Sequence, residues 1–163
     1  MKIFITGESG VGKTTLIKEI SDILIKREFK ISGFITTDFI LKGKRIGFNI
    51  VDINTKEERI FASKNIKLDF KFGSYYLNIK NLDEIFNKVL KRNYEILIID
   101  EIGKMEFYSE NFKEKIDNLM KSETKILATL HRDFVEKYKI YGNIFILTKE
   151  NKEKIKNEIL KIF

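Results

Sequence analysis

The sequence predicts a single α/β domain of three layers, in which a mainly parallel β-sheet carries helices on both faces. Three observations support this prediction. Short apolar runs alternate with helical stripes along most of the 163 residues, which is the pattern of repeated β-α-β units. A glycine-rich loop joins the first strand to the first helix, and an apolar run over 96–99 ends in two acidic residues. At this length, one domain spanning 1–163 is the simplest division of the chain.

The first β-α unit surrounds the glycine-rich loop. Residues 2–6 form a short apolar strand, and a helix expected over 13–28 carries an apolar stripe. The loop fits G-x-x-x-x-G-K-S/T, and its residues are Gly7, Glu8, Ser9, Gly10, Val11, Gly12, Lys13 and Thr14. Such a loop binds the phosphates of a nucleotide through successive N–H groups and the positive end of the helix. We expect Lys13 at the β- and γ-phosphates and the Thr14 hydroxyl on Mg²⁺.

The alternation is interrupted between about residues 37 and 79. A second strand is expected over 31–36. Apolar residues then alternate with polar or small ones between turns at 42–44 and 54–56. The runs 60–62 and 72–77 read as further strands. This pattern is typical of an antiparallel meander, so we expect one inserted at about 37–79.

The alternation resumes after residue 80. We expect a helix over 82–91 with Asn81 as its N-cap, and a helix after the N-cap Ser109. A strand over 126–130, a short helix over 134–138, a strand over 144–147 and a helix from about 150 complete the chain. Parallel sheets bind ligands at the carboxyl ends of their strands. That rule nominates the segments 36–38, 101–106, 129–132 and 148–151.

The acidic end of the strand at 96–99 carries the second functional signal. Its continuous apolar run is typical of a parallel strand buried on both faces, and Asp100 and Glu101 follow it. An Asp at this place usually serves the Mg²⁺ held by the loop threonine, so we assign Thr14 and Asp100 to the metal. Glu101 is placed to polarise a water for attack on the γ-phosphate. The nucleotide-binding residues expected here are Leu97, Ile98, Ile99, Asp100, Glu101, Ile102, Gly103 and Lys104.

Composition narrows the class of protein. The formal charge of +7 and the pI of about 9.4 suit a phosphate ligand and permit nucleic-acid contact without requiring it. The chain has no Cys and one His, which excludes disulfides and argues against zinc. A strand that begins at residue 2 leaves no room for a signal peptide, and no apolar stretch approaches the roughly 20 residues of a membrane span. We therefore expect a cytoplasmic protein that contacts no membrane, monomeric by default.

With these segments in view, the chain resembles the thermophile-type nucleoside-triphosphatases, also called cancer-related nucleoside-triphosphatases. Besides the phosphate loop, the matching segments are 33–36, 45–48, 72–75, 98–106 and 148–151, and Asp-Glu-Ile-Gly-Lys-Met-Glu over 100–106 is the most specific. The chain departs from the family at Asp38, where a Glu is common, and at Ile40 and Lys152, where an Arg is common. The resemblance implies slow, Mg²⁺-dependent hydrolysis of several nucleoside triphosphates on a P-loop fold of the RecA or nucleotide-kinase type.

Further candidate residues surround this expected site. Lys104 belongs to the most specific motif, and we count it with Lys13 and Glu101 as catalytic. Arg45 and Arg132 are alternative transition-state charges, although a surface role suits either one. Weaker candidates are Asp38, Glu106, Thr129 and His131, and the aromatic residues fit packing better than stacking on nucleic acid.

Three functions compete at this stage. The leading one is hydrolysis of ATP, GTP, CTP and UTP to diphosphate and phosphate, with broad base tolerance. The alternative is a kinase for a nucleotide, a small molecule or RNA at the same site. A GTP-dependent switch is the third, because residues 100–103 satisfy the motif D-x-x-G. The motif N-K-x-D, which recognises guanine, is missing, since residues 151–154 read Asn-Lys-Glu-Lys. The physiological substrate and the oligomeric state stay open.

Overall fold

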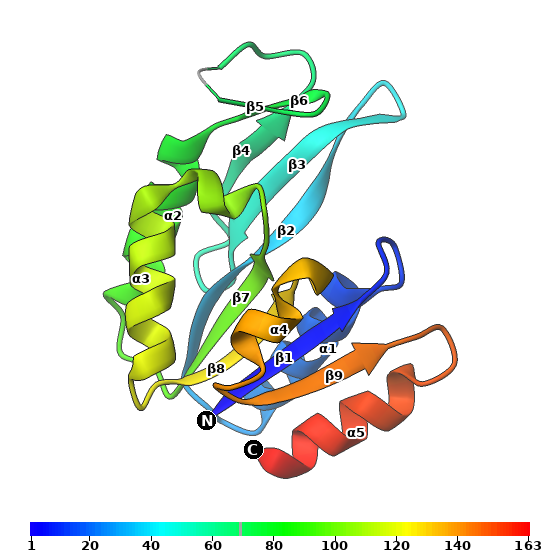
Figure 1. Ribbon diagram of the computed structural model, residues 1–163, viewed down its shortest axis with the longest axis vertical. Coiled ribbons are helices and arrows are strands. Elements are labelled where there is room, and N and C mark those ends of the chain that lie inside the picture. The colour runs from blue at the N-terminus through cyan, green and yellow to red at the C-terminus, as the bar shows by residue number, and fades with distance from the viewer. Residues whose placement is uncertain (69) are drawn as a thin grey trace.

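The computed structural model describes residues 1–68 and 70–163, and its strands form one twisted sheet (Figure 1). The strand order is β5-β6-β4-β3-β2-β7-β8-β1-β9. The strands are β1 (Lys2–Gly7), β2 (Ile31–Leu41), β3 (Lys44–Asp52), β4 (Glu58–Ser63), β5 (Phe70–Phe72), β6 (Tyr75–Leu77), β7 (Ile96–Ile102), β8 (Lys125–Leu130) and β9 (Asn143–Leu147). The α-helices are α1 (Lys13–Lys26), α2 (Ile79–Leu90), α3 (Glu110–Lys121), α4 (Val135–Tyr138) and α5 (Lys152–Ile162), and two short 3₁₀ turns are η1 (Glu106–Tyr108) and η2 (Arg132–Phe134).

Only half of the sheet is parallel, which corrects the prediction of a mainly parallel sheet. The strands β2, β7, β8, β1 and β9 pair in parallel. The other four pairings, from β2 through β3, β4 and β6 to β5, are antiparallel. The expected meander is therefore present over the described residues, but it extends the main sheet instead of standing beside it. The reason is that β2 pairs with both halves of the sheet. Its residues 31–34 pair in parallel with β7, and its residues 34–41 pair antiparallel with β3.

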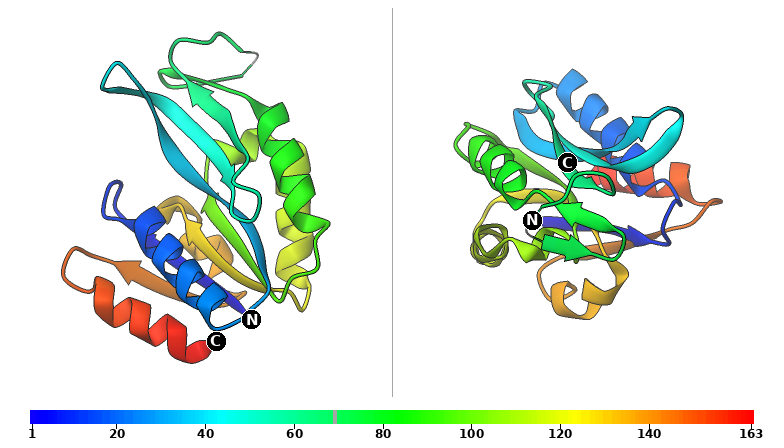
Figure 2. Two further views of the ribbon diagram at one scale, coloured as in Figure 1. Left: turned by 180° about the vertical axis from the view of Figure 1, so that it is seen from behind. Right: turned by 90° about the horizontal axis from the view of Figure 1, so that it is seen from above.

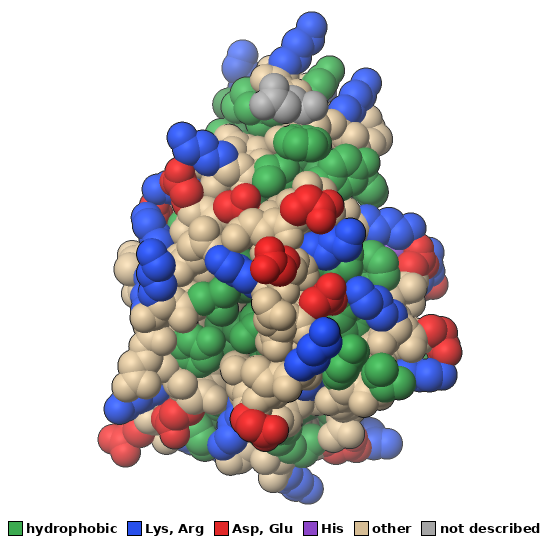
Figure 3. Space-filling model, turned by 60° about the vertical axis from the view of Figure 1, so that its left-hand side comes forward, with side chains coloured by type: hydrophobic (Ala, Val, Ile, Leu, Met, Phe, Trp, Pro, Cys, Tyr) green, Lys and Arg blue, Asp and Glu red, His purple; other side chains and the backbone are tan. Residues whose placement is uncertain are grey.

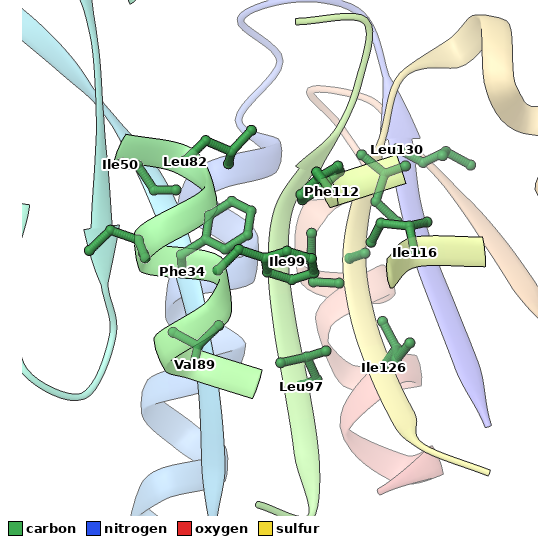
Figure 4. Close-up of a cluster of buried hydrophobic side chains, with 14 of the residues drawn as sticks. Phe34, Ile50, Leu82, Val89, Leu97, Ile99, Phe112, Ile116, Ile126 and Leu130 are labelled. Carbon is green, nitrogen blue, oxygen red and sulfur yellow. The ribbon is translucent and has the colours of Figure 1, made fainter. Parts of the chain in front are cut away.

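Helices cover both faces of the parallel half, as the sequence predicts. The helices α1 and α5 pack on one face and α2, α3 and α4 on the other (Figures 1 and 2). Alternate residues of the central strands feed the two core clusters. Leu97 and Ile99 of β7 join the α2–α3 side, while Ile98 joins the α1–α5 side. Figure 4 shows the first of these clusters, where Phe34, Ile99 and Phe112 pack side by side.

Several predicted boundaries shift. The N-cap of α2 is Asn78 and not Asn81, because the Asn78 side chain accepts the backbone N–H of Asn81, and the helix begins at Ile79. Ser109 caps α3 as predicted. The single strand expected over 72–77 is a hairpin, since Gly73 at φ 57° turns the chain between β5 and β6.

None of the helices in the described residues is both long and apolar enough to cross a membrane.

Candidate active site

The loop between β1 and α1 has the geometry of an anion site. Gly12, at φ 104°, is the N-cap of α1, and no described side chain caps the helix there. The first-turn N–H groups of α1 are therefore free of any capping side chain and point toward the loop. Gly7, at φ 150°, ends β1 so close to β9 that a Cβ atom would lie 2.6 Å from the Leu147 carbonyl oxygen. Both positions require glycine for the chain to turn here.

Lys13 lies across this loop. Its Nζ donates to the carbonyl oxygens of Gly7 and Glu8, at 3.0 and 3.1 Å. These carbonyls belong to two consecutive residues, at the end of β1 and the start of the loop. The ammonium group is thus held over the N-terminus of α1, where a bound phosphate would meet both positive charges.

A cavity of about 540 Å³ opens in front of the loop. It brings together residues from the loop, α1, β2, β3 and the end of β7. The lining residues are Ser9, Gly10, Gly12, Lys13, Thr14, Thr15, Lys18, Thr36, Thr37, Asp38, Arg45, Phe48 and Glu101. The predicted phosphate loop, Thr14 and Glu101 therefore meet at one place. Thr15 and Lys18 of α1 join them without having been predicted, whereas Thr37 lies in the segment 36–38 that the strand-end rule nominated and Phe48 in the family-matching segment 45–48.

Asp100 is buried at the end of β7 and is held by its neighbouring strands. One carboxylate oxygen accepts from both the N–H and the hydroxyl of Thr36 on β2, at 3.1 and 3.0 Å. The other accepts from the Thr129 hydroxyl on β8, at 2.6 Å. The three bonds fix the orientation of the carboxylate at the strand end. Thr129, a weaker candidate in the sequence, is thus a positioning partner of Asp100.

Glu101 lines the cavity and has a strongly shifted pKa. Burial raises its pKa from the usual 4.5 to about 7; the Lys13 ammonium opposes this rise, and the Asp100 carboxylate adds to it. A carboxyl group with a pKa near neutral pH is suited to take up and release a proton in a reaction at that pH.

A second buried carboxyl group lies behind Glu101. Glu106 of η1 is 6% exposed, and burial raises the pKa of its carboxyl group well above 4.5, with the Glu101 charge adding to the effect. A Cβ atom at Gly103 would lie 2.7 Å from a Glu106 carboxylate oxygen and 3.5 Å from the Glu101 carboxyl carbon. A larger side chain at Gly103 would collide with the Glu106 carboxyl group and crowd that of Glu101. This explains why the motif at 100–106 has glycine at this position.

Some predicted residues lie away from the cavity. Leu97, Ile98, Ile99 and Ile102 are 0% exposed in the core clusters, because β7 is covered on both faces, so their side chains pack in the core. Their assignment as nucleotide-binding residues stays a prediction. Lys104 is exposed, forms an ion pair with Asp133 of η2 and does not line the cavity.

The remaining candidates occupy the rim. Arg45 lines the cavity and pairs with Asp38 at 3.6 Å. Arg132 lies 3.9 Å from Glu8, at the outer side of the loop. His131 caps η2 by accepting the N–H of Asp133 through Nδ1, and burial lowers its pKa while Asp133 opposes that shift. His131 thus has a structural role here.

Metal binding at this site would depend on few protein ligands. In the described part of the chain, no group of three or more His, Cys, Asp or Glu side chains is arranged to hold a metal ion. The donors that the sequence predicts are the Thr14 hydroxyl, which lines the cavity, and the Asp100 carboxylate of β7. Magnesium at phosphate sites keeps several waters and uses one or two protein oxygens with the substrate phosphates, so the donor set fits Mg²⁺.

Comparison with known proteins agrees with this arrangement. The NTPase family profile matches residues 2–160. Nucleoside-triphosphatase THEP1 of Methanocaldococcus jannaschii is 45% identical over 163 residues, which cover 98% of this chain and 95% of the relative. THEP1 of Thermotoga maritima is 40% identical, covering 99% and 95% of the two chains.

Solved structures of the same kind share the fold. The crystal structure of THEP1 from Aquifex aeolicus superposes with a TM-score of 0.85 at 33% identity, covering 99% of this chain and 98% of that one. The solution structure of a human cancer-related nucleoside triphosphatase gives a TM-score of 0.82 at 25% identity, covering 99% and 96%. The chain is thus an α/β protein with a mixed sheet and five helices, and it belongs to the THEP1 family of nucleoside-triphosphatases.

Proposed function

We propose that this chain binds nucleoside triphosphates in the cavity together with Mg²⁺ and hydrolyses them to nucleoside diphosphate and phosphate. One observation carries the proposal. The N-terminus of α1, with Lys13 and Thr14, faces Glu101 across a single cavity, and the pKa of Glu101 is raised to about 7. An anion site and a general base therefore share one space. The THEP1 names of the relatives agree with this activity.

The phosphates bind to the loop between Gly7 and Thr14. The N–H groups of the loop and of the first turn of α1 donate to the phosphate oxygens. Lys13 leaves the carbonyls of Gly7 and Glu8 to pair with the β- and γ-phosphates. Thr14 and Asp100 would hold Mg²⁺, and the hydrogen bonds from Thr36 and Thr129 would orient the Asp100 carboxylate for that role. Bound Mg²⁺ supplies charge neutralisation to the transferring phosphoryl group.

Hydrolysis then proceeds by in-line attack of water. Glu101 accepts a proton from the attacking water as its oxygen bonds to the γ-phosphorus. The bond from the γ-phosphorus to the bridging oxygen breaks, and its electron pair stays with the diphosphate. Lys13 stabilises the charge that develops there. Of the two arginine candidates, Arg45 is the better placed, because it lines the cavity. The catalytic role of Lys104 stays a prediction, since Lys104 would first have to break its ion pair with Asp133.

Broad base tolerance is the second part of the proposal. The chain lacks the N-K-x-D element that reads guanine, and the Asn151 side chain bonds the backbone of Thr148 and Ile146. We expect less than about tenfold difference in affinity among ATP, GTP, CTP and UTP, because about 1.4 kcal/mol of differential contact corresponds to tenfold.

The test measures phosphate release from each of the four triphosphates, with Mg²⁺ and with a chelator. Hydrolysis of all four that the chelator abolishes is the expected result. Activity that persists without divalent cation refutes the metal assignment. Exclusive binding of GTP, measured by calorimetry, would instead assign the chain to the switch class.

A kinase reaction is the second candidate, and the lining of the cavity is the observation that favours it. Besides the loop and Glu101, the cavity is lined by the polar side chains of Thr37, Asp38 and Arg45, which could bind an acceptor whose hydroxyl takes the place of water. A screen of nucleotides, small alcohols and RNA with γ-labelled ATP decides between the two. Label transferred to an acceptor faster than to water establishes the kinase.

A further inference from the structure

A row of aromatic side chains crosses the antiparallel half of the sheet, starting at the wall of the cavity. We call it the aromatic strip; its members are Phe48, Tyr75, Phe72, Tyr108 and Phe70. The Phe48 and Tyr75 rings lie 5.4 Å apart, Phe72 stands directly opposite Tyr75, and Tyr108 of η1 lies 5.9 Å from Phe72 and 6.1 Å from Phe70. Phe48 also lines the triphosphate cavity. The strip is therefore continuous with the candidate active site.

Core packing does not account for this strip. Phe70 and Tyr108 are 42% and 40% exposed, and the other three rings are partly exposed. By contrast, the aromatic cluster of Phe34, Phe86 and Phe112 is 0% exposed. Partly exposed aromatic rings that follow one another along a surface can stack successive bases of a single strand.

Positive charge accompanies the rings. The Arg45 guanidinium lies 5.3 Å from the Phe48 ring centroid, and Lys64 Nζ lies 5.2 Å from that of Tyr75. The two segments that carry most of the strip, 39–48 and 64–76, contain six Lys or Arg residues and one acidic residue. Figure 3 shows hydrophobic side chains gathered at this end of the molecule, with Lys and Arg side chains projecting around them. The surface thus combines stacking faces with charge that complements phosphates.

We propose that the aromatic strip binds single-stranded nucleic acid, with bases stacked on the rings and backbone phosphates paired with Arg45, Lys64 and their neighbours. One end of the bound strand then lies at Phe48, beside the triphosphate cavity. A duplex hides its base faces, so it binds more weakly. The proposal concerns a site separate from the phosphate loop and does not depend on the hydrolytic mechanism.

The experiment is fluorescence anisotropy of the full chain with a labelled oligonucleotide of about 12 nucleotides, a length within the usual range for single-strand sites. The double variant Phe70→Ala/Tyr108→Ala is expected to weaken binding about tenfold or more, because two stacking faces are lost. Lys64→Glu is expected to reduce the slope of log affinity against log salt by about 0.7, the value for one phosphate contact on a single strand. A duplex of the same sequence is the second probe.

Matched controls lie on other surfaces. Ile140→Ala removes an apolar side chain that is 74% exposed, more than either ring, and Lys154→Glu reverses an exposed charge on α5; both should leave binding unchanged. Circular dichroism and phosphate release, measured on the same samples, report folding and the active site separately. The proposal is overturned if no single strand binds at low salt, if the duplex binds as well, or if Lys154→Glu weakens binding as much as Lys64→Glu. It is also overturned if sedimentation shows that the strip joins two copies of the chain and no oligonucleotide binds.

Discussion

The pKa of Glu101 leads to a specific prediction about the pH dependence of hydrolysis. Burial raises this pKa from 4.5 to about 7, and a general base acts only when it is deprotonated. About one tenth of the Glu101 carboxyl groups are therefore ionised at pH 6 and about nine tenths at pH 8, by the ordinary titration relation. The catalytic rate should rise about tenfold between these pH values and then level off. An unperturbed glutamate would give a rate already constant above about pH 6.

Replacing Glu101 by Gln isolates this carboxyl group. The amide keeps the size of the side chain and cannot accept the proton of water, so the rate should fall by about 10²- to 10⁴-fold, the usual range for loss of a general base. The residual rate should also lose its rise between pH 6 and 8.

The assay is single-turnover phosphate release at saturating triphosphate and Mg²⁺, from pH 5.5 to 8.5, with nucleotide affinity measured in parallel. Glu110→Gln, on an exposed position of α3, is the control and should behave as wild type. The assignment of the base is refuted if the wild-type rate is flat across this range, or if the Gln variant keeps both its rate and its pH profile. Asp38, on the cavity wall, would then be the next candidate.

Three further predictions follow from single contacts. Lys13→Ala should lower the hydrolysis rate by about 10²-fold or more, because a charge that stabilises the transferring phosphoryl group is lost. The melting temperature should stay unchanged, because the hydrogen bonds of Nζ go to the loop carbonyls of Gly7 and Glu8; Lys26→Ala is the control and should behave as wild type. Asp100→Asn should weaken nucleotide affinity in Mg²⁺ but not in chelator, measured by calorimetry, and equal losses in both would contradict the metal role. Arg92→Met should destabilise the fold by about 3–5 kcal/mol in urea unfolding, since it leaves the buried Asp52 carboxylate without its cation. Burial acts to raise the pKa of Asp52, but the hydrogen bonds from Arg92 and from the N–H groups of Asn54 and Thr55 outweigh it and lower the pKa. The contribution of the Asp52–Arg92 pair to stability should therefore be complete above about pH 4 and be lost below it.

The local motifs could be predicted from the sequence because their residues are neighbours in the chain. The phosphate loop needs glycine at Gly7 and Gly12 for backbone conformations that other residues resist, and Lys13 follows within one turn. The continuous apolar run of β7 lies within a few consecutive residues. The sequence therefore predicts Asp100 and Glu101 at the carboxyl end of this strand. The family and the α/β class also followed from these segments.

The surroundings of the motifs depend on contacts between distant segments. The Asp100 carboxylate is held by Thr36 and Thr129, which lie 64 and 29 residues away. No local pattern indicates such partners. The same is true of Glu106, whose burial beside Glu101 depends on how η1 packs under the strand end.

By itself, the sequence determined the phosphate loop, the acidic strand end and the alternation of strands and helices, because each is encoded within a few consecutive residues. Only the tertiary structure decided that β2 joins both halves of the sheet, that Lys104 pairs with Asp133, and that Phe48 lines the cavity beside Arg45. Strand pairing and side-chain burial are settled by the packing of the whole chain, and they can override what any short segment prefers.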